Sequence, residues 1–440
     1  MKISKKNIII LLAFLSLIVN FIGHSLKVNI IVYLSIILTS SLMLISNIEY
    51  GTYILFISLP FFNLFTPVVG TTSLYYIYVI LYILKNIYQC IKKRKFNNLI
   101  YKYIIFTVII IFTMRNFFES SLMDYISWLI FCLMFIFMYK SRDTKLSNII
   151  KFYTISFIIS SICGYIGIIN NWSHIFPVQL HEMWGSSGVT LRFVGLAGES
   201  NSYAQIALLL ICFNIINIIT SNSKKKIENY LYIFIIITFS LLTYSKMFII
   251  GLAIIGILMF IYIVQKNFKN GVKLSNLLKV GTMIALITYA IFVLILNNLD
   301  NEVLLNYGIR FASKDLFTGR FDVYDYFFKF LSSNVLYMLF GIGFANYDIP
   351  WGAGKHAHNI YLECILLFGI IVFLLVFILI ILKIFKNFKK NKTLLLYIPL
   401  IIYLITGFSL HSMLSNYFFF IMVLILNIFE DDYYIGKINN

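Results

Sequence analysis

The feature that most constrains this chain is a series of nearly uncharged apolar segments that are long enough to cross a lipid bilayer. A spanning helix needs roughly 20 predominantly apolar residues, and such runs follow one another along most of the chain. Only 12% of the 440 residues are charged, whereas roughly a quarter are charged in a globular domain. Because the short alternating segments of a membrane β-barrel do not occur, the sequence predicts an all-α polytopic integral membrane protein.

The placement of the basic residues predicts the orientation of these spans. Lys and Arg gather in clusters between alternate spans, which is typical of loops on the cytoplasmic side. The clusters fall at 2–6, 92–95, 140–145, 224–226, 266–273 and 383–392. The net charge of +18 is therefore assigned to orientation and to contact with anionic membrane lipid, and no nucleic-acid partner is expected. Both termini are expected in the cytoplasm.

The spans between these clusters form a helical bundle of about 12–14 transmembrane helices in a single membrane domain, 1–440. The expected ranges are 7–23, 29–46, 51–68, 72–90, 99–114, 122–139, 149–169, 190–219, 229–244, 247–264, 276–297, 356–382, 394–410 and 413–429. The first is interpreted as an uncleaved span, since no small-residue cleavage site follows it. Pro60 and Pro67 predict that the third span is kinked or re-entrant.

The alternation of sides makes 298–355 a large extracytoplasmic loop. Within it, segment 320–339 has apolar residues at Phe321, Tyr324, Phe327, Phe328, Leu331 and Val335. This near-helical spacing predicts an amphipathic helix along the outer membrane surface. Gly341 and Gly343 are expected to end it. A helix that merely covers the bundle is the simpler alternative, and the sequence leaves it open.

Ionisable residues within or beside apolar spans are costly, so each needs a reason. Arg192 is expected to begin the eighth span at its outer end, with Glu199 on the same side of the helix, about 10 Å away. Together with Asn201 they would line one cavity, although Arg192 would equally well extend to the lipid headgroups. Lys246 would either hold an anionic group or anchor its pair of helices.

The outer loop adds two arginines and two histidines. Arg310 and Arg320 would suit two-point contact with a diphosphate, or would simply be solvated. His356 and His358 lie two residues apart and do not share a helix face, so a metal site is disfavoured and one histidine becomes a candidate general base. The remaining histidines are interpreted as interfacial residues and the five cysteines as packing residues. No cofactor and no metal are expected.

Four motifs in fixed order carry a family resemblance. They are LRFVGLAGESN at 191–201, TYSKMFIIG at 243–251, TGR at 318–320, and the segment 340–370 that contains HAHNIYLE. In this order they resemble the O-antigen ligase and polysaccharide polymerase superfamily of bacterial envelope proteins, over a core of about 190–370. Lys246 departs from the pattern, because the family usually has arginine there, whose fork contacts phosphate at two points.

The resemblance implies glycosyl transfer from a polyprenyl-diphosphate-linked oligosaccharide on the outer face of the bacterial cytoplasmic membrane. Arg192 and Arg320, with Lys246 or Arg310, would hold the diphosphate charge, and His358 would serve as base. Glu199 or Glu363 would orient a sugar or the base. Asn201 and Asn359 would help to bind substrate. A chain-length regulator and a flippase of the same pathway are the implied protein partners.

A polymerase of capsule, exopolysaccharide or O-antigen repeat units is the preferred hypothesis. A ligase that moves a finished glycan onto an acceptor uses the same scaffold. A transporter of lipid-linked saccharides would place ionisable residues near the bilayer midplane and show symmetry between its halves, and neither pattern is visible. A noncatalytic envelope scaffold is the remaining alternative.

Overall fold

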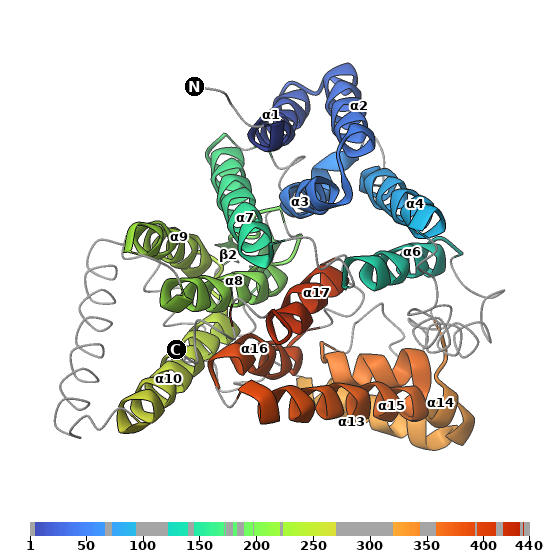
Figure 1. The fold of residues 1–440 in the computed structure, drawn as a ribbon. Coiled ribbons are helices and arrows are strands. Elements are labelled where there is room, and N and C mark those ends of the chain that lie inside the picture. The colour runs from blue at the N-terminus through green and yellow to red at the C-terminus, as the bar shows by residue number, and fades with distance from the viewer. Residues whose placement is uncertain are drawn as a thin grey trace.

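The computed structural model is an all-α bundle with one short β-hairpin in the residues that it describes (Figure 1). Those residues are 5–66, 73–93, 122–139, 145–170, 172, 179–182, 189–196, 198–220, 223–269, 320–343, 358–391, 394–410, 417–431 and 434. The expected spans 99–114 and 276–297 and most of the loop 298–355 lie outside them. The single-domain prediction therefore stays a prediction.

Before the hairpin the elements are α1 (Lys5–Ser25), α2 (Asn29–Ile45), α3 (Ile48–Ser58), the 3-10 helix η1 (Leu59–Phe65), α4 (Tyr75–Lys93), α6 (Leu122–Tyr139) and α7 (Leu146–Ile169). The hairpin pairs β1 (Gln179–Glu182) antiparallel with β2 (Val189–Arg192). After it come α8 (Ser200–Thr220), α9 (Ser223–Leu241), α10 (Lys246–Lys269), α13 (Arg320–Ser333), α14 (Val335–Phe340), α15 (Ile360–Asn391), η5 (Leu395–Tyr397), α16 (Ile398–Gly407) and α17 (Phe418–Ile428).

The helices have the length and composition of membrane spans. In the described part of the chain, six are long and apolar enough to cross a bilayer, and shorter apolar helices accompany them. Large apolar side chains such as Leu11, Ile30 and Leu382 lie exposed on the outside, where a bilayer would solvate them. The prediction of an all-α polytopic membrane protein is confirmed.

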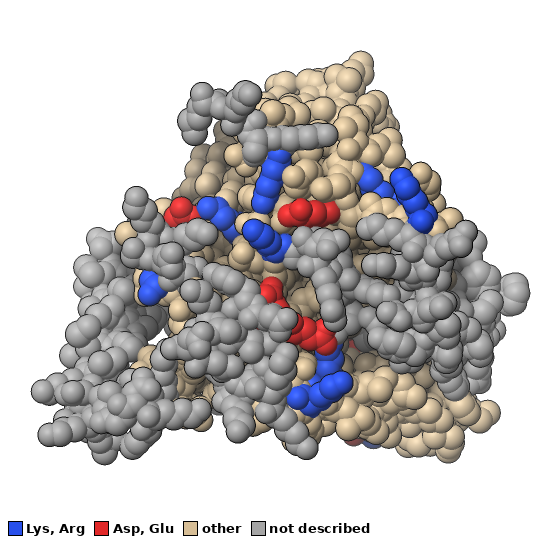
Figure 2. Space-filling view, viewed as in Figure 1, with Lys and Arg blue, Asp and Glu red and all other residues tan. Residues whose placement is uncertain are grey.

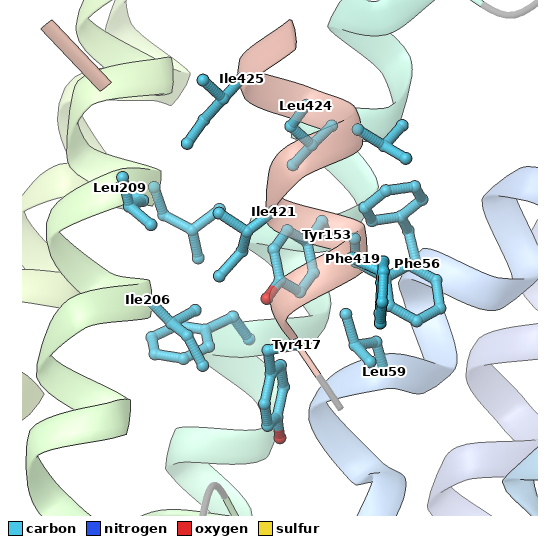
Figure 3. Close-up of a cluster of buried hydrophobic side chains, with 14 of the residues drawn as sticks. Phe56, Leu59, Tyr153, Ile206, Leu209, Tyr417, Phe419, Ile421, Leu424 and Ile425 are labelled. Atoms are coloured by element: carbon cyan, nitrogen blue, oxygen red, sulfur yellow. The ribbon is translucent and has the colours of Figure 1, made fainter. Parts of the chain in front are cut away.

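The core is centred on α8 and α17. Ile206 and Leu209 of α8 approach the side chains of α17, and Phe56 of α3 closes the other side (Figure 3). The Phe56 ring stands edge-on to Phe420 of α17, with ring centroids 5.3 Å apart. Helix α17 therefore lies between α8 of the family-like core and α3 of the first spans.

The regular α-helix of the third span is interrupted beside Pro60, as predicted, whereas Pro67 lies outside the described residues. The α-helix ends at Ser58 and the chain continues as the 3-10 helix η1, with Pro60 at its start, because proline cannot donate the helix hydrogen bond. Side chains from other segments satisfy carbonyl oxygens on both sides of this change. Ser156 of α7 donates to the Ile57 oxygen, three residues before Pro60. Near the end of η1, His24 Nε2 lies 2.6 Å from the Leu64 oxygen, and Ser73 Oγ donates to the Phe62 oxygen at 2.8 Å.

The predicted eighth span, 190–219, is wrong at its start. Val189–Arg192 forms strand β2, and the helix begins only at Ser200. Gly195 and Gly198 adopt φ values of +57° and +79°, a left-handed conformation that interrupts a helix. Since Arg192 lies in a strand, it does not share a helical face with Glu199, and that part of the expectation is also wrong.

The expected span 356–382 begins later and is broken. Asn359 Oδ1 caps the helix by accepting from the Tyr361 and Leu362 amides at 3.0 and 3.2 Å, so α15 starts at Ile360. Gly369 interrupts it with φ +80°. The freed carbonyl oxygens of Leu366 and Leu367 accept from the Ile342 and Gly343 amides at 2.8 and 3.1 Å. The end of α14 is thus docked into the break in α15.

The outer-loop segment forms two helices, α13 and α14, separated at Asn334, and Gly341 ends the second as expected. Phe327 and Leu331 are buried, but Phe328 and Val335 are 59% and 58% exposed. The predicted apolar face is therefore only partly correct. One side of the segment packs on the bundle. Apolar side chains on its other side stay exposed, where a membrane surface would contact them.

Basic and acidic side chains pair at the end of the bundle away from the hairpin. Lys151 of α7 meets Glu228 of α9 at 2.7 Å, and Lys383 of α15 meets Glu430 after α17 at 3.1 Å. Figure 2 shows basic side chains interspersed with acidic ones over one face of the molecule. The first pair brings the starts of α7 and α9 together, and the second brings the ends of α15 and α17 together.

Substitution of Gly369 tests the docking of α14 into α15. A Cβ at residue 369 would collide with the Leu339 backbone, and the left-handed φ adds strain. We expect Gly369→Ala to cost roughly 2–4 kcal/mol and to lower the melting temperature in detergent. The control is Gly256→Ala in α10, where a Cβ meets nothing within 4 Å. Equal melting temperatures for the two variants would contradict this account of the break.

Candidate functional site

The residues singled out from the sequence lie where helices begin. Helix α10 starts at Lys246 and α13 at Arg320, while α8 follows Glu199 and α15 follows Asn359. The first amide groups of a helix lack partners within it, and the helix dipole makes that end positive. A place where several helices begin therefore favours an anion such as phosphate.

The end of α16 brings three of these helix starts together. Gln205 of α8 donates to Thr406 Oγ1 at 2.8 Å. The Tyr361 hydroxyl of α15 donates to the Leu404 oxygen at 2.6 Å. The Tyr324 hydroxyl of α13 donates to the Phe408 oxygen at 2.8 Å. Each bond comes from near the start of its helix, so α8, α13 and α15 begin at the same end of the bundle.

Hydrogen bonds from Arg192 connect the start of α10 to this group. Its Nε donates to the Thr243 oxygen at 2.9 Å, and its Nη2 donates to Asn201 Oδ1 at 3.2 Å. Ser245 Oγ donates to the same Asn201 oxygen at 3.0 Å. These bonds join β2, the first turn of α8 and the turn that precedes Lys246.

The side chain of Arg192 is 1% exposed. The alternative in which it extends to the lipid headgroups is therefore wrong. A buried guanidinium is tolerated only where hydrogen bonds and charge compensate for its lost hydration. Its burial strengthens its electrostatic effect on nearby groups, because water screens it little.

One candidate residue, His358, and one residue close to another candidate, Tyr244, have strained backbones. Tyr244 and His358 have φ values of +48° and +47°, and a non-glycine residue in this region costs roughly 1–3 kcal/mol. Tyr244 lies two residues before Lys246, and His358 directly precedes the cap of α15. Such conformations concentrate at functional sites, where the surrounding structure enforces them.

The two glutamates occupy different settings. Glu363 is completely buried in the first turn of α15, where the helix dipole favours a negative charge. Glu199 is half-buried before α8, and its Oε2 accepts from Ser202 Oγ at 2.8 Å. Asn359 is buried and caps α15, so its amide oxygen orients the helix that follows His358.

The remaining predicted residues are placed only in part. Arg320 is fixed by its backbone as the first residue of α13, four positions before Tyr324. Arg310 and His356 lie outside the described residues. No three His, Cys, Asp or Glu side chains gather as a metal site would require, in the part of the chain that the structure describes.

Other residues of the site were not found by sequence reasoning. The hydroxyl of Ser245 and the carbonyl of Thr243 belong to the TYSK motif, which indicated only Lys246. Thr406 and Tyr361 matter because they connect helices that are distant in sequence. His24, interpreted as interfacial, is 5% exposed and contacts η1.

Residues 231–377 match the family model described as O-antigen ligase. The matched range includes Lys246, Arg320 and His358 and begins after Arg192, Glu199 and Asn201. No curated protein and no solved structure matches the chain. The family match confirms the resemblance carried by the motifs, and it supports a glycosyl-transfer function of the ligase or polymerase type.

Substitution of Arg192 tests whether the guanidinium holds the site together. Arg192→Lys keeps the charge but cannot maintain both bonds, so buried acceptors lose a donor. We expect a cost of roughly 1–3 kcal/mol, measured as a lower melting temperature in detergent. Lys329→Arg, on the exposed face of α13, is the control and should melt like the wild type. Unchanged melting of Arg192→Lys would show that these bonds are not structural.

Proposed function

We propose that the protein is a polysaccharide polymerase, starting from the match of residues 231–377 to the family model described as O-antigen ligase. It would join polyprenyl-diphosphate-linked oligosaccharide repeat units on the outer face of the bacterial cytoplasmic membrane. The products would be capsule, exopolysaccharide or O-antigen chains. The predicted alternation of spans places Lys151 and Lys383 near the cytoplasmic side. The candidate residues lie at the end of the bundle opposite the Lys151–Glu228 and Lys383–Glu430 pairs, which supports a site on the outer face.

The convergence of four helix starts on one end of the bundle carries the proposal. The donor's leaving group is a lipid diphosphate, which gains charge as the glycosidic bond breaks. Helix starts and buried cations stabilise such charge without reorganising. The starts of α8, α10, α13 and α15, together with the buried guanidinium of Arg192, give the site the positive potential that this leaving group needs.

The cations would have two different roles: some would contact the diphosphate, and one would position the residues that do. Lys246 at the start of α10 and Arg320 at the start of α13 would contact the diphosphate. Arg192 is bonded to the turn before Lys246, so it would position that turn and add its positive charge. Arg310, outside the described residues, would be a further contact from the outer loop. Loss of one such cation would slow transfer by about 10²–10³.

His358 would act as the general base. The acceptor sugar hydroxyl attacks the anomeric carbon, its proton passes to His358, and the bond from that carbon to the diphosphate oxygen breaks. The electron pair leaves with the lipid diphosphate, and a single displacement inverts the anomeric configuration. The strained backbone at His358 and the cap at Asn359 would hold the imidazole in place. Such a base contributes about 10²–10⁴ in rate.

Glu199 or Glu363 would orient the reacting groups. Glu363 lies one turn along α15 from Asn359, whose carbonyl oxygen accepts the Glu363 amide at 3.0 Å. It would support the segment that carries His358. Glu199 and Asn201 lie at the start of α8 and would contact the saccharide. The mechanism needs no metal, because cations of the chain neutralise the diphosphate.

A ligase is the second candidate, because the matching family is described as O-antigen ligase. It would use the same donor chemistry with a different acceptor. The number of expected spans favours polymerase, and so do aromatic residues between those spans, since such rings suit stacking on sugars: Trp172, Trp184, Tyr347 and Trp351, of which the last three lie outside the described residues. A chain-length regulator and a flippase would be partners of the polymerase. A transporter is disfavoured, since the candidate charges collect at one end of the bundle.

Glycan profiles from the source strain test the proposal. A deletion strain would carry the wild type, His358→Ala or Arg320→Ala, and lipid-linked and surface glycans would be separated on gels. We expect a ladder of chain lengths from the wild type and single repeat units from both variants, since the base and a phosphate cation are lost.

Lys329→Ala is the matched control, because Lys329 lies on α13 and pairs only locally with Asp325 in an exposed position. It should retain the ladder. Long chains that stay on the lipid carrier in the deletion strain would identify a ligase. A ladder that persists in both His358→Ala and Arg320→Ala would refute the assigned catalytic roles.

A further inference from the structure

The kinked third span reaches the candidate site, although it lies far outside the matched family segment. Residues Leu59 to Leu64 of η1 are buried with one exception, Asn63, which is exposed. Its Nδ2 donates to the backbone oxygen of Leu196 at 2.7 Å. Leu196 lies in the loop between Arg192 and Asn201, which are themselves hydrogen-bonded.

The path of this loop depends on a few specific contacts. Gly195 and Gly198 flank Leu196, and both adopt left-handed φ values, which residues other than glycine rarely adopt. At its start, the Phe193 amide donates to the Leu242 oxygen at 2.9 Å. At its end, α8 begins at Ser200. Between these points, Asn63 provides the hydrogen bond to the Leu196 carbonyl, and a Cβ on Gly198 would lie 3.4 Å from Asn63 Nδ2.

The element that presents Asn63 is firmly held. His24 of α1 contacts the Leu64 oxygen, and Ser73 donates to the Phe62 oxygen. The Thr66 hydroxyl donates to the Asn63 oxygen at 2.9 Å. Phe62 and Phe65 pack against Tyr75 of α4, with ring centroids 5.2 and 6.1 Å apart. Asn63 is therefore a polar side chain that a well-packed element presents to the loop at Leu196.

We infer that Asn63 is a positioning residue for the transfer site. By fixing the Leu196 carbonyl it sets the path of the chain from Arg192 to the start of α8, and so the place of Glu199 and Asn201. Asn63 needs no contact with the substrate for this role. The first three spans are then part of the catalytic unit. The effect on catalysis rests on the proposed function, whereas the effect on the loop does not.

Hydrogen–deuterium exchange of the purified protein tests the positioning directly. In Asn63→Ala the loop loses its central hydrogen bond, and we expect the amides of 193–199 to exchange roughly tenfold faster. Asn63→Asp is isosteric but sets a carboxylate against the Leu196 carbonyl, so exchange should rise at least as much. Asn63→Gln keeps the donor and should fall between the wild type and Asn63→Ala.

Asn148→Ala is the matched control. Asn148 of α7 also donates one side-chain bond, to the Tyr53 hydroxyl at 3.3 Å, at the opposite end of the bundle. It should leave exchange at 193–199 unchanged. Wild-type exchange in both Asn63→Ala and Asn63→Asp would overturn the inference, and Asn63→Gln decides the matter if either variant fails to accumulate.

Kinetics with a lipid-linked saccharide donor extend the test to function. We expect Asn63→Ala to lower kcat/KM by about tenfold, since misplacing binding groups slows a positioned reaction, with recovery in Asn63→Gln. Asn148→Ala should behave as the wild type. If the wild type makes no glycan, the proposed function fails while the exchange result still decides the role of Asn63. If the wild type is active and Asn63→Ala matches it, the catalytic part of the inference fails.

Discussion

Every backbone amide and carbonyl inside a bilayer must find its partner within the protein, and this constraint governs the places where the helices break. At Pro60, at Gly195–Gly198 and at Gly369 the regular helix or strand is interrupted, and polar backbone groups are released. Each interruption is closed by a group from a distant segment: Ser156 at Ile57, Asn63 at Leu196, and the end of α14 at Leu366 and Leu367. Each break is therefore a joint, a place where two distant segments are hydrogen-bonded to each other.

These joints determine where the candidate site residues lie. The joint at Gly369 anchors the outer-loop helices beside α15, and the end of α16 fixes the starts of α8, α13 and α15 by three hydrogen bonds. Arg192 adds the start of α10 through Thr243 and Asn201. Positive helix ends and a buried guanidinium thus face one region of the bundle. Such an arrangement costs free energy in an empty site and is favourable when a diphosphate is bound.

The sequence predicted most of the spans that the described residues contain, because apolar length is a direct signal. It predicted the kink at Pro60 and the end of α14 at Gly341, since proline and glycine act locally. It failed at Arg192, because apolar composition predicts a helix there, whereas pairing with β1 makes 189–192 a strand and the glycines at 195 and 198 delay the start of α8. It also failed to find Asn63 and Thr406. Their roles depend on contacts across 133 and 201 positions, which no local pattern encodes.

The central claim is that the end of the bundle where these helices begin catalyses glycosyl transfer from a lipid diphosphate. The most direct measurement uses the purified protein in lipid nanodiscs with a synthetic polyprenyl-diphosphate-linked repeat unit as sole substrate. The account predicts a ladder of products, with one polyprenyl diphosphate released for each linkage formed and with chelators present throughout. Recovery of the repeat unit unchanged, with no diphosphate lipid released, from protein that remains folded would contradict it.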